Sequence, residues 1–211
     1  VTYTTMLSGC ADQVALIEGI RLHTCLASDG IETHAKNALL NMYAKCGDIE
    51  RALEQFNSEI SEQSVVCWNS MISGFFLESG VFYSKPLRLC QQMMCQGTMA
   101  TPVTYATLFT TCSNILAQDE GMRLHSVISG SPIEADTVVG NALIQMYGKC
   151  GSLHSARSVF NHMCKRNIFS WNLMIGVYAS HGSLRASMDF FQAMCLEFCP
   201  DEVTFATAVS A

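Results

Sequence analysis

The apolar residues of this chain recur at the spacing of amphipathic helices, most regularly within residues 37–56. A first apolar stripe consists of Leu39, Leu40, Met42 and Tyr43. Gly47 interrupts it, as expected where a helix ends on a left-handed residue, and Asp48 is a favourable N-cap for a following helix. The second stripe, at positions i, i+3, i+4 and i+7, consists of Ile49, Ala52, Leu53 and Phe56. The pattern predicts two helices joined by a short turn, each with one buried face.

This stretch occurs twice. Residues 37–56 have the sequence NALLNMYAKCGDIERALEQF, and residues 141–160 have NALIQMYGKCGSLHSARSVF; ten of the twenty positions are identical at a constant offset of 104. The motif EGIRLH at 18–23 returns as EGMRLH at 120–125, and Trp68 returns as Trp171. The true period is therefore about 100 residues, made of three helix–turn–helix units of unequal length.

The repeat pattern divides the chain into six units and the beginning of a seventh. The predicted units are 1–32, 33–64, 65–101, 102–136, 137–167, 168–201 and the truncated 202–211. One pair of amphipathic helices cannot bury its apolar stripes alone, whereas stacked neighbours can. The sequence therefore predicts an all-α solenoid whose first helices line one surface.

Unit 65–101 is the least regular, with the weakest pattern over 78–101. Pro86 would break a helix interior, because proline removes a hydrogen bond and clashes with the preceding turn. We therefore place Pro86 in the first turn of a helix. The residues expected to be buried on that helix are Leu87, Cys90 and either Met93 or Met94.

Composition limits the classes of function. The chain has 211 residues, of which 49% are hydrophobic and 14% charged, enough apolar material for a buried core. No apolar run is long enough for a transmembrane helix, so we expect no membrane partner. The net charge of −6 argues against a strongly basic surface that grips phosphates, although it leaves single-stranded nucleic acid binding through base edges open. The chain begins with Val1 and starts inside a repeat, so we expect a piece of a longer protein.

The 11 cysteines are interpreted as free, mostly buried thiols, because several recur at matching repeat positions among apolar residues. Cys10 with His23, and Cys112 with His125, lack the close second Cys and second His of a zinc finger, which favours core packing. No motif pairs a nucleophile with a base, and no glycine-rich phosphate loop occurs. We expect no catalytic residue, metal or cofactor, and hence no enzyme.

Two families of helical repeat fit the A-x-x-x-F spacing of the second helices. Tetratricopeptide repeats have a fixed period of about 34 residues, whereas the unit lengths here cycle. The sequence resembles plant pentatricopeptide repeat (PPR) proteins of the PLS subclass. VTY…C…EGxRLH resembles their long repeats (1–32, 102–136), NALxxMYxKCG their short repeats (33–64, 137–167) and WNxMI their standard repeats (65–101, 168–201). The resemblance implies a right-handed superhelical solenoid.

The resemblance also implies sequence-specific binding of single-stranded RNA, with one base per repeat. In this family two residues mainly contact the base: the one after the aromatic early in the first helix, and the last of the repeat. The implied base-contacting pairs are Thr4 with Glu32, Asn37 with Ser64, Asn69 with Thr101, Ala106 with Asp136, Asn141 with Asn167, and Asn172 with Asp201. The residues implied to wedge between bases are Val66, Val103, Val138 and Phe169.

The family's pairing rules imply a pyrimidine-rich target of five or six nucleotides, running 5′ to 3′ from the N- to the C-terminal repeats. Asn with Asp resembles a uracil-binding pair, Asn with Asn a cytosine-binding pair, and Asn with Ser or Thr a less strict pyrimidine-binding pair. Ala106 has no side chain that can form a hydrogen bond, so base contact by its repeat is in doubt.

Other interpretations of these residues remain. Asn37, Asn69, Asn141 and Asn172 could instead cap helix N-termini, although their recurrence at matching positions favours RNA contact. Trp68, Trp171 and Tyr105 are expected in the core. The chain as a whole could be a tetratricopeptide-like protein-interaction scaffold, or a decayed fragment that binds nothing. An electropositive groove with the Asn side chains exposed would favour RNA, and apolar pockets would favour a peptide.

The resemblance places the protein in the mitochondrion or chloroplast, as a specificity factor in RNA processing or C-to-U RNA editing. The H-x-E and C-x-x-C signatures of a zinc deaminase are not in this chain. Any deaminase activity would therefore come from outside the chain or from an RNA-editing partner protein.

Overall fold

The computed structural model describes residues 2–30, 35–58, 64–77 and 84–209. In these ranges the chain is helical with connecting turns and contains no strand. No helix in them is long and apolar enough to cross a membrane. The helices are α1 (Thr2–Asp12), α2 (Leu16–Ser28), α3 (Lys36–Lys45), α4 (Ile49–Asn57), α5 (Val65–Leu77), α6 (Ser84–Cys95), α7 (Pro102–Asn114), α8 (Gln118–Ile128), α9 (Thr137–Lys149), α10 (Leu153–His162), α11 (Ile168–Ser180), α12 (Leu184–Glu197) and α13 (Glu202–Val209).

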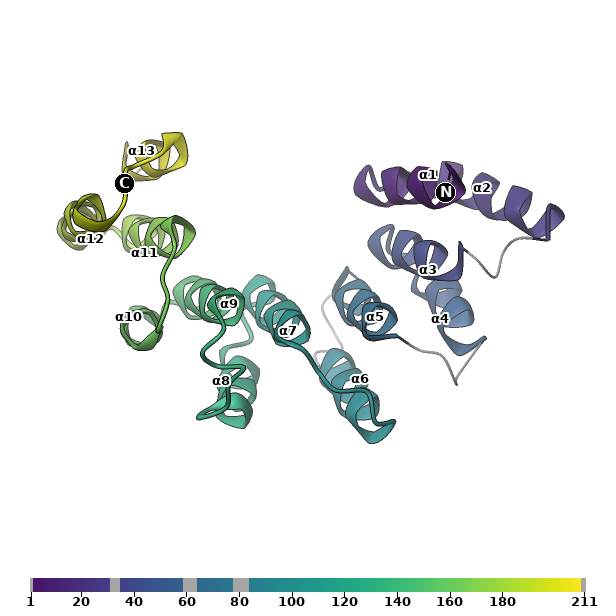
Figure 1. The fold of residues 1–211 in the computed structure, drawn as a ribbon, viewed down its shortest axis with the longest axis horizontal. Helices are drawn as coiled ribbons and strands as arrows, with labels where there is room; N and C mark the ends of the chain where they lie inside the picture. Colours follow the sequence, from purple (N-terminus) through teal and green to yellow (C-terminus); the bar gives the residue numbers. More distant parts are fainter. Residues whose placement is uncertain (1, 31–34, 59–63, 78–83, 210–211) are drawn as a thin grey trace. The chain divides into compact units, whose positions relative to one another are not determined.

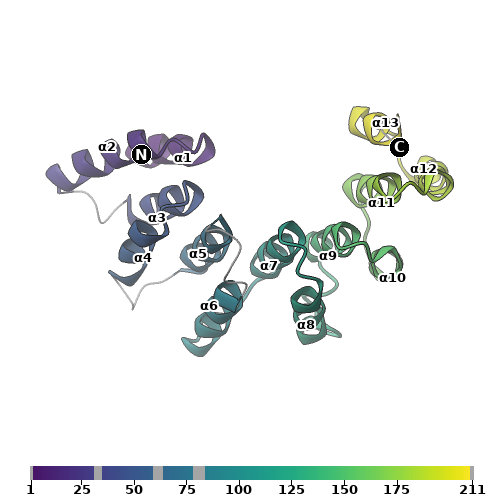
Figure 2. The same cartoon turned by 180° about the vertical axis from the view of Figure 1, so that it is seen from behind.

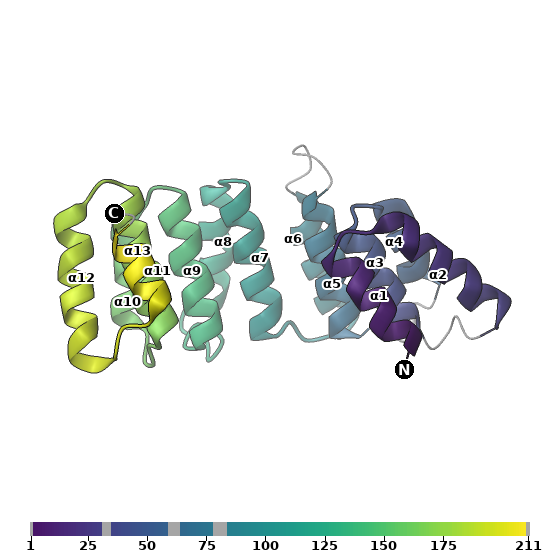
Figure 3. The ribbon, with the colours of Figure 1, turned by 90° about the horizontal axis from the view of Figure 1, so that it is seen from above.

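The chain forms two compact units, residues 1–104 and 105–211. In the first unit, α1, α3 and α5 pack in a row, and α4 packs against both α3 and α5 (Figure 1). In the second unit, α9, α11 and α13 form the row, and α12 packs against α11 and α13 (Figure 2). The two helices of a hairpin lie alongside each other, as α11 and α12 show when seen from above (Figure 3). Each unit is thus a stack of helical hairpins, which confirms the predicted all-α solenoid class.

Glycine ends the first helix of the hairpins predicted as short repeats. Gly47 and Gly151 have φ values of +79° and +81°, a region that residues with a Cβ rarely adopt. The next residue's N–H closes the turn, as in Asp48 N to Tyr43 O at 3.0 Å. Asp48 also caps α4 by accepting from Arg51 N at 3.2 Å. The predicted helix end at Gly47 and N-cap at Asp48 are therefore confirmed.

The hairpins α1–α2 and α7–α8 make the same turn without glycine. Val14 and Leu116 take φ values of 54° and 56°, and Ala15 N closes the first of these turns on Cys10 O at 2.8 Å. The left-handed conformation brings a Cβ close to the following carbonyl and costs about 1–2 kcal/mol. Both side chains are exposed, so burial of apolar surface at these positions does little to offset this cost.

Aromatic side chains form the contacts between successive hairpins. Phe56 on α4 meets Trp68 on α5 edge-on, with ring centroids 4.7 Å apart. Phe160 on α10 meets Trp171 on α11 in the same way at 4.8 Å. Trp68, Trp171 and Tyr105 are buried, which confirms their predicted place in the core. Phe160 also contacts Phe190 on α12, so one ring connects three helices.

The irregular hairpin α5–α6 shows which residues of its second helix are buried. Pro86 is the third residue of α6, in its first turn as predicted. Cys90 and Met93 are buried, whereas Met94 is 45% exposed, so Met93 is the core residue of the two. The side chain of Leu87 lies outside the described residues.

The expectation of mostly buried cysteines is wrong. All eleven are free thiols, but only Cys67, Cys90 and Cys112 are buried. Burial raises the pKa of Cys112 to about 12. The five exposed thiols are Cys25, Cys95, Cys164, Cys195 and Cys199. Of the cysteines that recur between the first and second units, Cys112 is buried and Cys10, Cys46 and Cys150 are half-buried.

First helices approach one another closely at one recurring position. A Cβ built on Gly148 of α9 would lie 2.3 Å from Cγ2 of Val177 on α11. In the first unit the glycine lies on the other helix of the pair. A Cβ on Gly74 of α5 would lie 2.8 Å from Cβ of Ala44 on α3. Ala44 and Gly148 are 104 residues apart, and Gly74 and Val177 are 103 apart. One member of each pair must therefore be glycine.

We expect Gly148→Ala to destabilise the protein by about 1–3 kcal/mol, because the new methyl group meets a β-branched side chain with little rotational freedom. The matched control is Gly9→Ala on α1, where a Cβ would meet nothing within 4 Å. There the substitution should be neutral or stabilise by about 0.5–1 kcal/mol. Urea unfolding followed by circular dichroism measures both, and equal effects would contradict the close α9–α11 contact.

Candidate RNA-binding junctions

The predicted base-contacting residues lie where one hairpin ends and the next first helix begins. Asn69, Asn141 and Asn172 are the fifth residues of α5, α9 and α11. They lie inside their helices, so the alternative that they cap helix N-termini is wrong. The other member of each pair precedes the next first helix and has the capping role instead. We call each such place, formed by the pair and the third residue of the following helix, a junction.

The junction of Asn141, Asn167 and Ser170 is the most completely bonded. Asn167 caps α11 by accepting from Ser170 N at 2.9 Å, and Ser170 Oγ accepts in return from Asn167 N at 3.3 Å, a capping box. Ser170 Oγ also lies 2.7 Å from Asn141 Oδ1 and 2.9 Å from Asn167 Oδ1. One buried hydroxyl therefore connects both members of the predicted pair.

The junction of Asn172, Asp201 and Thr204 uses a carboxylate. Asp201 Oδ1 accepts from Thr204 N at 2.8 Å and from Thr204 Oγ1 at 2.7 Å. Asn172 Nδ2 donates to the same oxygen at 3.4 Å. The hydroxyl of Thr204, followed by its backbone N–H, lowers the pKa of Asp201. Oδ1 of Asn172 is buried and accepts no hydrogen bond from any residue that the structure describes.

The junction of Asn37, Ser64 and Cys67 has the same arrangement with a thiol. Cys67 Sγ lies 2.9 Å from Asn37 Oδ1 and 3.2 Å from Ser64 Oγ. Cys67 N donates to Ser64 Oγ at 3.4 Å, so Ser64 caps α5. A thiol is a weaker donor than a hydroxyl, which makes this the weakest of the three connections.

The junction of Asn69, Thr101 and Thr104 is connected only in part. Thr101 and Thr104 cap each other, with Thr101 N to Thr104 Oγ1 at 3.1 Å and Thr104 N to Thr101 Oγ1 at 3.4 Å. Oδ1 of Asn69 is buried and has no hydrogen-bond partner within the described part of the chain. The structure thus brings together three of the predicted pairs, those of Asn37, Asn141 and Asn172, through hydrogen bonds.

The two pairs predicted in long repeats differ. Glu32 lies outside the described residues, and its partner Thr4 is exposed on α1. Ala106 is half-buried on α7, and Asp136 caps α9 through Val138 N at 2.8 Å. The third residue of α9 is Val139, buried and apolar, so it offers no hydrogen bond to a preceding pair. The matching position before Asn37 is Ala35, which is also buried and apolar.

Exposure of the Asn side chains is uneven along the row. Asn37 is exposed and Asn69 half-buried, whereas Asn141 and Asn172 are each only 8% exposed. The exposed Asn row that would favour RNA over a peptide is therefore found only in part, because Asn141 and Asn172 of the second unit are buried.

The predicted wedge residues share one place. Each is the second residue of its helix and is 53–61% exposed, although the residues that follow it are buried. These residues are Val66, Val103, Val138 and Phe169. Val203, the second residue of α13, is exposed to the same degree and was missed. An apolar side chain thus stands in solvent beside every junction.

Sequence reasoning also missed the third residue of each following helix. Cys67, Thr104, Ser170 and Thr204 each precede an aromatic residue, namely Trp68, Tyr105, Trp171 and Phe205. The small polar residue directly before each of these aromatic residues is the sequence signal that could have identified this position.

Comparison with known proteins identifies the hairpins. The PPR repeat model matches residues 35–58, 141–168 and 169–197. The chain contains PPR repeats. Its relatives in Arabidopsis thaliana include a pentatricopeptide repeat-containing protein 34% identical over the whole chain, and chloroplastic and mitochondrial ones 32% and 35% identical. The chain spans 21%, 29% and 31% of their lengths.

Solved PPR structures share the fold. All of the chain superposes on 36% of the pentatricopeptide repeat protein PPR10 from maize, with a TM-score of 0.69 and 18% identity. PPR10 in complex with an 18-nt psaJ RNA element gives a TM-score of 0.76 at 19% identity, over 98% of this chain and 31% of that one.

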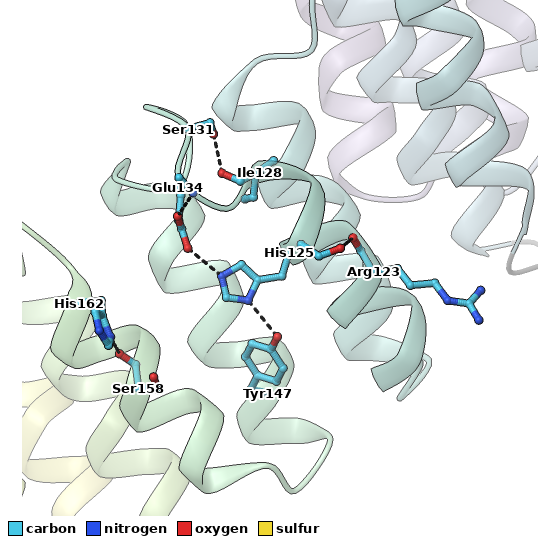
Figure 4. A network of polar contacts seen from close by, with 10 residues as sticks. Arg123, His125, Ile128, Ser131, Glu134, Tyr147, Ser158 and His162 are labelled. Carbon is cyan, nitrogen blue, oxygen red and sulfur yellow. Dashed lines mark hydrogen bonds and ion pairs between the residues drawn. The ribbon is translucent and has the colours of Figure 1, made fainter.

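A second polar network connects α8 with α9 and with the turn between them (Figure 4). His125 on α8 lies 2.9 Å from Tyr147 Oη through Nδ1 and 3.2 Å from Glu134 Oε1 through Nε2. Because a carboxylate only accepts, Nε2 carries the proton of the contact with Glu134. His23 and Tyr43 make the same contact at 2.7 Å, 102 and 104 residues earlier. The recurrence indicates a role in packing.

This network borders an open cavity of about 590 Å³ lined by His125, Glu134, His162 and Cys164 among others. In the ranges that the structure describes, no three or more His, Cys, Asp or Glu residues are grouped so that they could hold a metal ion.

We expect Thr204→Val to raise the pKa of Asp201 towards its ordinary value, because the substitution removes the hydroxyl that most favours the carboxylate. The depressed pKa contributes stability above the ordinary value of 3.8, and this is lost as the pH falls through the lower folded value. NMR titration of the carboxyl carbon measures the pKa. Thr207→Val, one turn further along α13, should leave it unchanged; an equal shift there would contradict the assignment.

Proposed function

We propose that this chain binds single-stranded RNA, with one base at each junction between successive PPR repeats. The observation that carries the proposal is that three predicted base-contacting pairs come together at junctions, each flanked by an exposed apolar side chain. Short amide, hydroxyl and carboxylate groups can form hydrogen bonds with the edge of an unpaired base, and the apolar neighbour can pack against its face.

The comparisons support RNA as the ligand. The relatives are pentatricopeptide repeat-containing proteins, and PPR10, which has the same fold, is described in complex with an 18-nt RNA. A net charge of −6 gives this chain little general attraction for phosphates. Affinity therefore depends on contacts with bases, and such contacts favour sequence selectivity over general binding.

The pairs favour a pyrimidine-rich target. We propose that Asn172 with Asp201 selects uracil, Asn141 with Asn167 selects cytosine, and Asn37 with Ser64 and Asn69 with Thr101 accept either pyrimidine. The first long repeat offers Thr4, and Ala106 gives the second no hydrogen-bonding side chain to pair with Asp136.

The biological setting is a further part of the proposal. The alternation of three repeat types over about 100 residues supports a PLS arrangement. Relatives named chloroplastic and mitochondrial support an organellar location. We propose a specificity factor in organellar RNA processing or C-to-U editing, whose deaminase activity comes from elsewhere in a longer protein or from a partner protein.

We expect eight-nucleotide pyrimidine oligomers to bind the 211-residue chain at least about tenfold more tightly than purine oligomers, equivalent to ~1.4 kcal/mol. The physical reason is that most pairs match the hydrogen-bonding edge of a pyrimidine. Fluorescence anisotropy at two salt concentrations measures the affinities. Equal affinity for both classes, or none for either at low salt, would contradict the proposal.

We expect Asn141→Asp to shift the preference of repeat 137–167 from cytosine towards uracil by about tenfold, because a carboxylate replaces the donor group of the amide. Asn161→Asp on the exposed side of α10 adds the same charge away from the junctions and is the control. Oligomers that differ at one nucleotide measure the preference, and circular dichroism measures the fold. A loss of helicity without a change in preference would count against the assignment.

A further inference from the structure

The third residue of each following helix has a role beyond capping at the junctions. The hydroxyl of Ser170 is fully buried and carries one hydrogen, yet it lies within 2.9 Å of two amide oxygens, Asn141 Oδ1 and Asn167 Oδ1. Capping needs only the contact with Asn167. The contact with Asn141 crosses 29 residues and joins two successive repeats.

This contact decides which groups of the pair remain for a ligand. With both amide oxygens turned towards Ser170, Asn141 and Asn167 each keep an Nδ2 donor. Two donors match a base edge with two neighbouring acceptors. Cytosine offers O2 and N3 as acceptors, whereas uracil places a donor, N3–H, between its carbonyl oxygens.

The junction of Asn172 and Asp201 has the opposite polarity. Thr204 occupies Asp201 Oδ1 with its N–H and its hydroxyl, and Asn172 Nδ2 donates to the same oxygen. The group that remains for a ligand is an acceptor, Oδ2 of the exposed Asp201, whereas Oδ1 of Asn172 is buried and accepts no hydrogen bond from the described residues. An acceptor matches the N3–H donor of uracil.

We propose that Ser170 and Thr204 are positioning residues for base selection: Ser170 orients the amide of Asn141, and Thr204 holds the carboxylate of Asp201 to which Asn172 donates, so each influences which groups the pair of the preceding repeat presents. The inference rests on the proposed RNA binding. Cys67 has the same place in the junction of Asn37, where its weaker thiol donor gives a looser orientation and a less strict choice of pyrimidine. Val139 and Ala35, at the matching positions after the two long repeats, provide no such group.

Ser170→Ala tests the inference. Without the hydroxyl, the amide of Asn141 can rotate by 180° and present its oxygen, so the preference for cytosine over uracil should fall by roughly three- to tenfold, the effect of one neutral hydrogen bond. Asn167 keeps its contact with the backbone N–H of residue 170, so α11 retains its cap. A uracil octamer with a single cytosine moved through each position identifies the nucleotide concerned in the wild type, and anisotropy gives the ratio of the two Kd values.

Two kinds of control separate positioning from stability. Ser187→Ala removes an equally buried hydroxyl, which donates to Ile175 O at 3.2 Å and lies outside the junctions. It should leave the ratio unchanged. Ser170→Thr keeps the hydroxyl, as in Thr204, and should keep the ratio, whereas Ser170→Cys, as in Cys67, should give an intermediate one. If Ser170→Ala fails to fold, Ser170→Cys takes its place in the test, and a lowered ratio of the two Kd values is the expected result.

The outcomes distinguish this inference from the proposed function. A wild type that binds none of the oligomers overturns RNA binding, and the inference with it. A wild type that prefers cytosine at one position, with Ser170→Ala or Ser170→Cys retaining the full ratio, overturns only the positioning role. An equal loss in Ser187→Ala also overturns it, because the effect would then reflect general loosening of the repeats.

Discussion

The edge-on contact between a phenylalanine of one hairpin and a tryptophan of the next is the interaction on which the structure depends. Phe56 with Trp68 and Phe160 with Trp171 join a second helix to the following first helix. A hairpin of this size has no core of its own, so it is ordered only by such contacts with its neighbours. Trp171 directly follows Ser170. The packing that stabilises the stack therefore also fixes the hydroxyl on which the junction depends.

Local chemistry made much of the fold predictable. Gly47 and Pro86 act through their own backbone and Asp48 through its own side chain, so the sequence alone shows where these helices end or begin. Repetition at offsets of 102 to 104 residues then predicts that the hairpins stack. Val14 and Leu116 could not be anticipated, since nothing in a β-branched or leucine side chain indicates a left-handed turn; the surrounding hairpin imposes it. Cysteine exposure was mispredicted because a free thiol is tolerated both in a core and in solvent.

The candidate site was predictable only in part, for a similar reason. Asn141 and Asn167 could be selected because they recur at positions that a family resemblance marks. Their connection through Ser170 could not, because that serine has a sufficient local explanation as a capping-box residue. Its contact with Asn141 depends on how two helices pack. The uneven exposure of the four Asn residues likewise depends on packing, since Asn141 and Asn172 are buried and Asn37 is exposed at matching positions of the repeats.

The junctions also bear on how arrays of this kind can be rearranged. Asn141 and Ser170 lie in different repeats, and the same holds for Asn172 and Thr204. A cut made at the conventional repeat boundary therefore separates an amide from the hydroxyl that orients it. Duplication or transplantation of one repeat creates two hybrid sites, one at each seam. A cassette such as residues 140–170, which starts after Val139 and ends with Ser170, would move the complete site of Asn141, Asn167 and Ser170 instead.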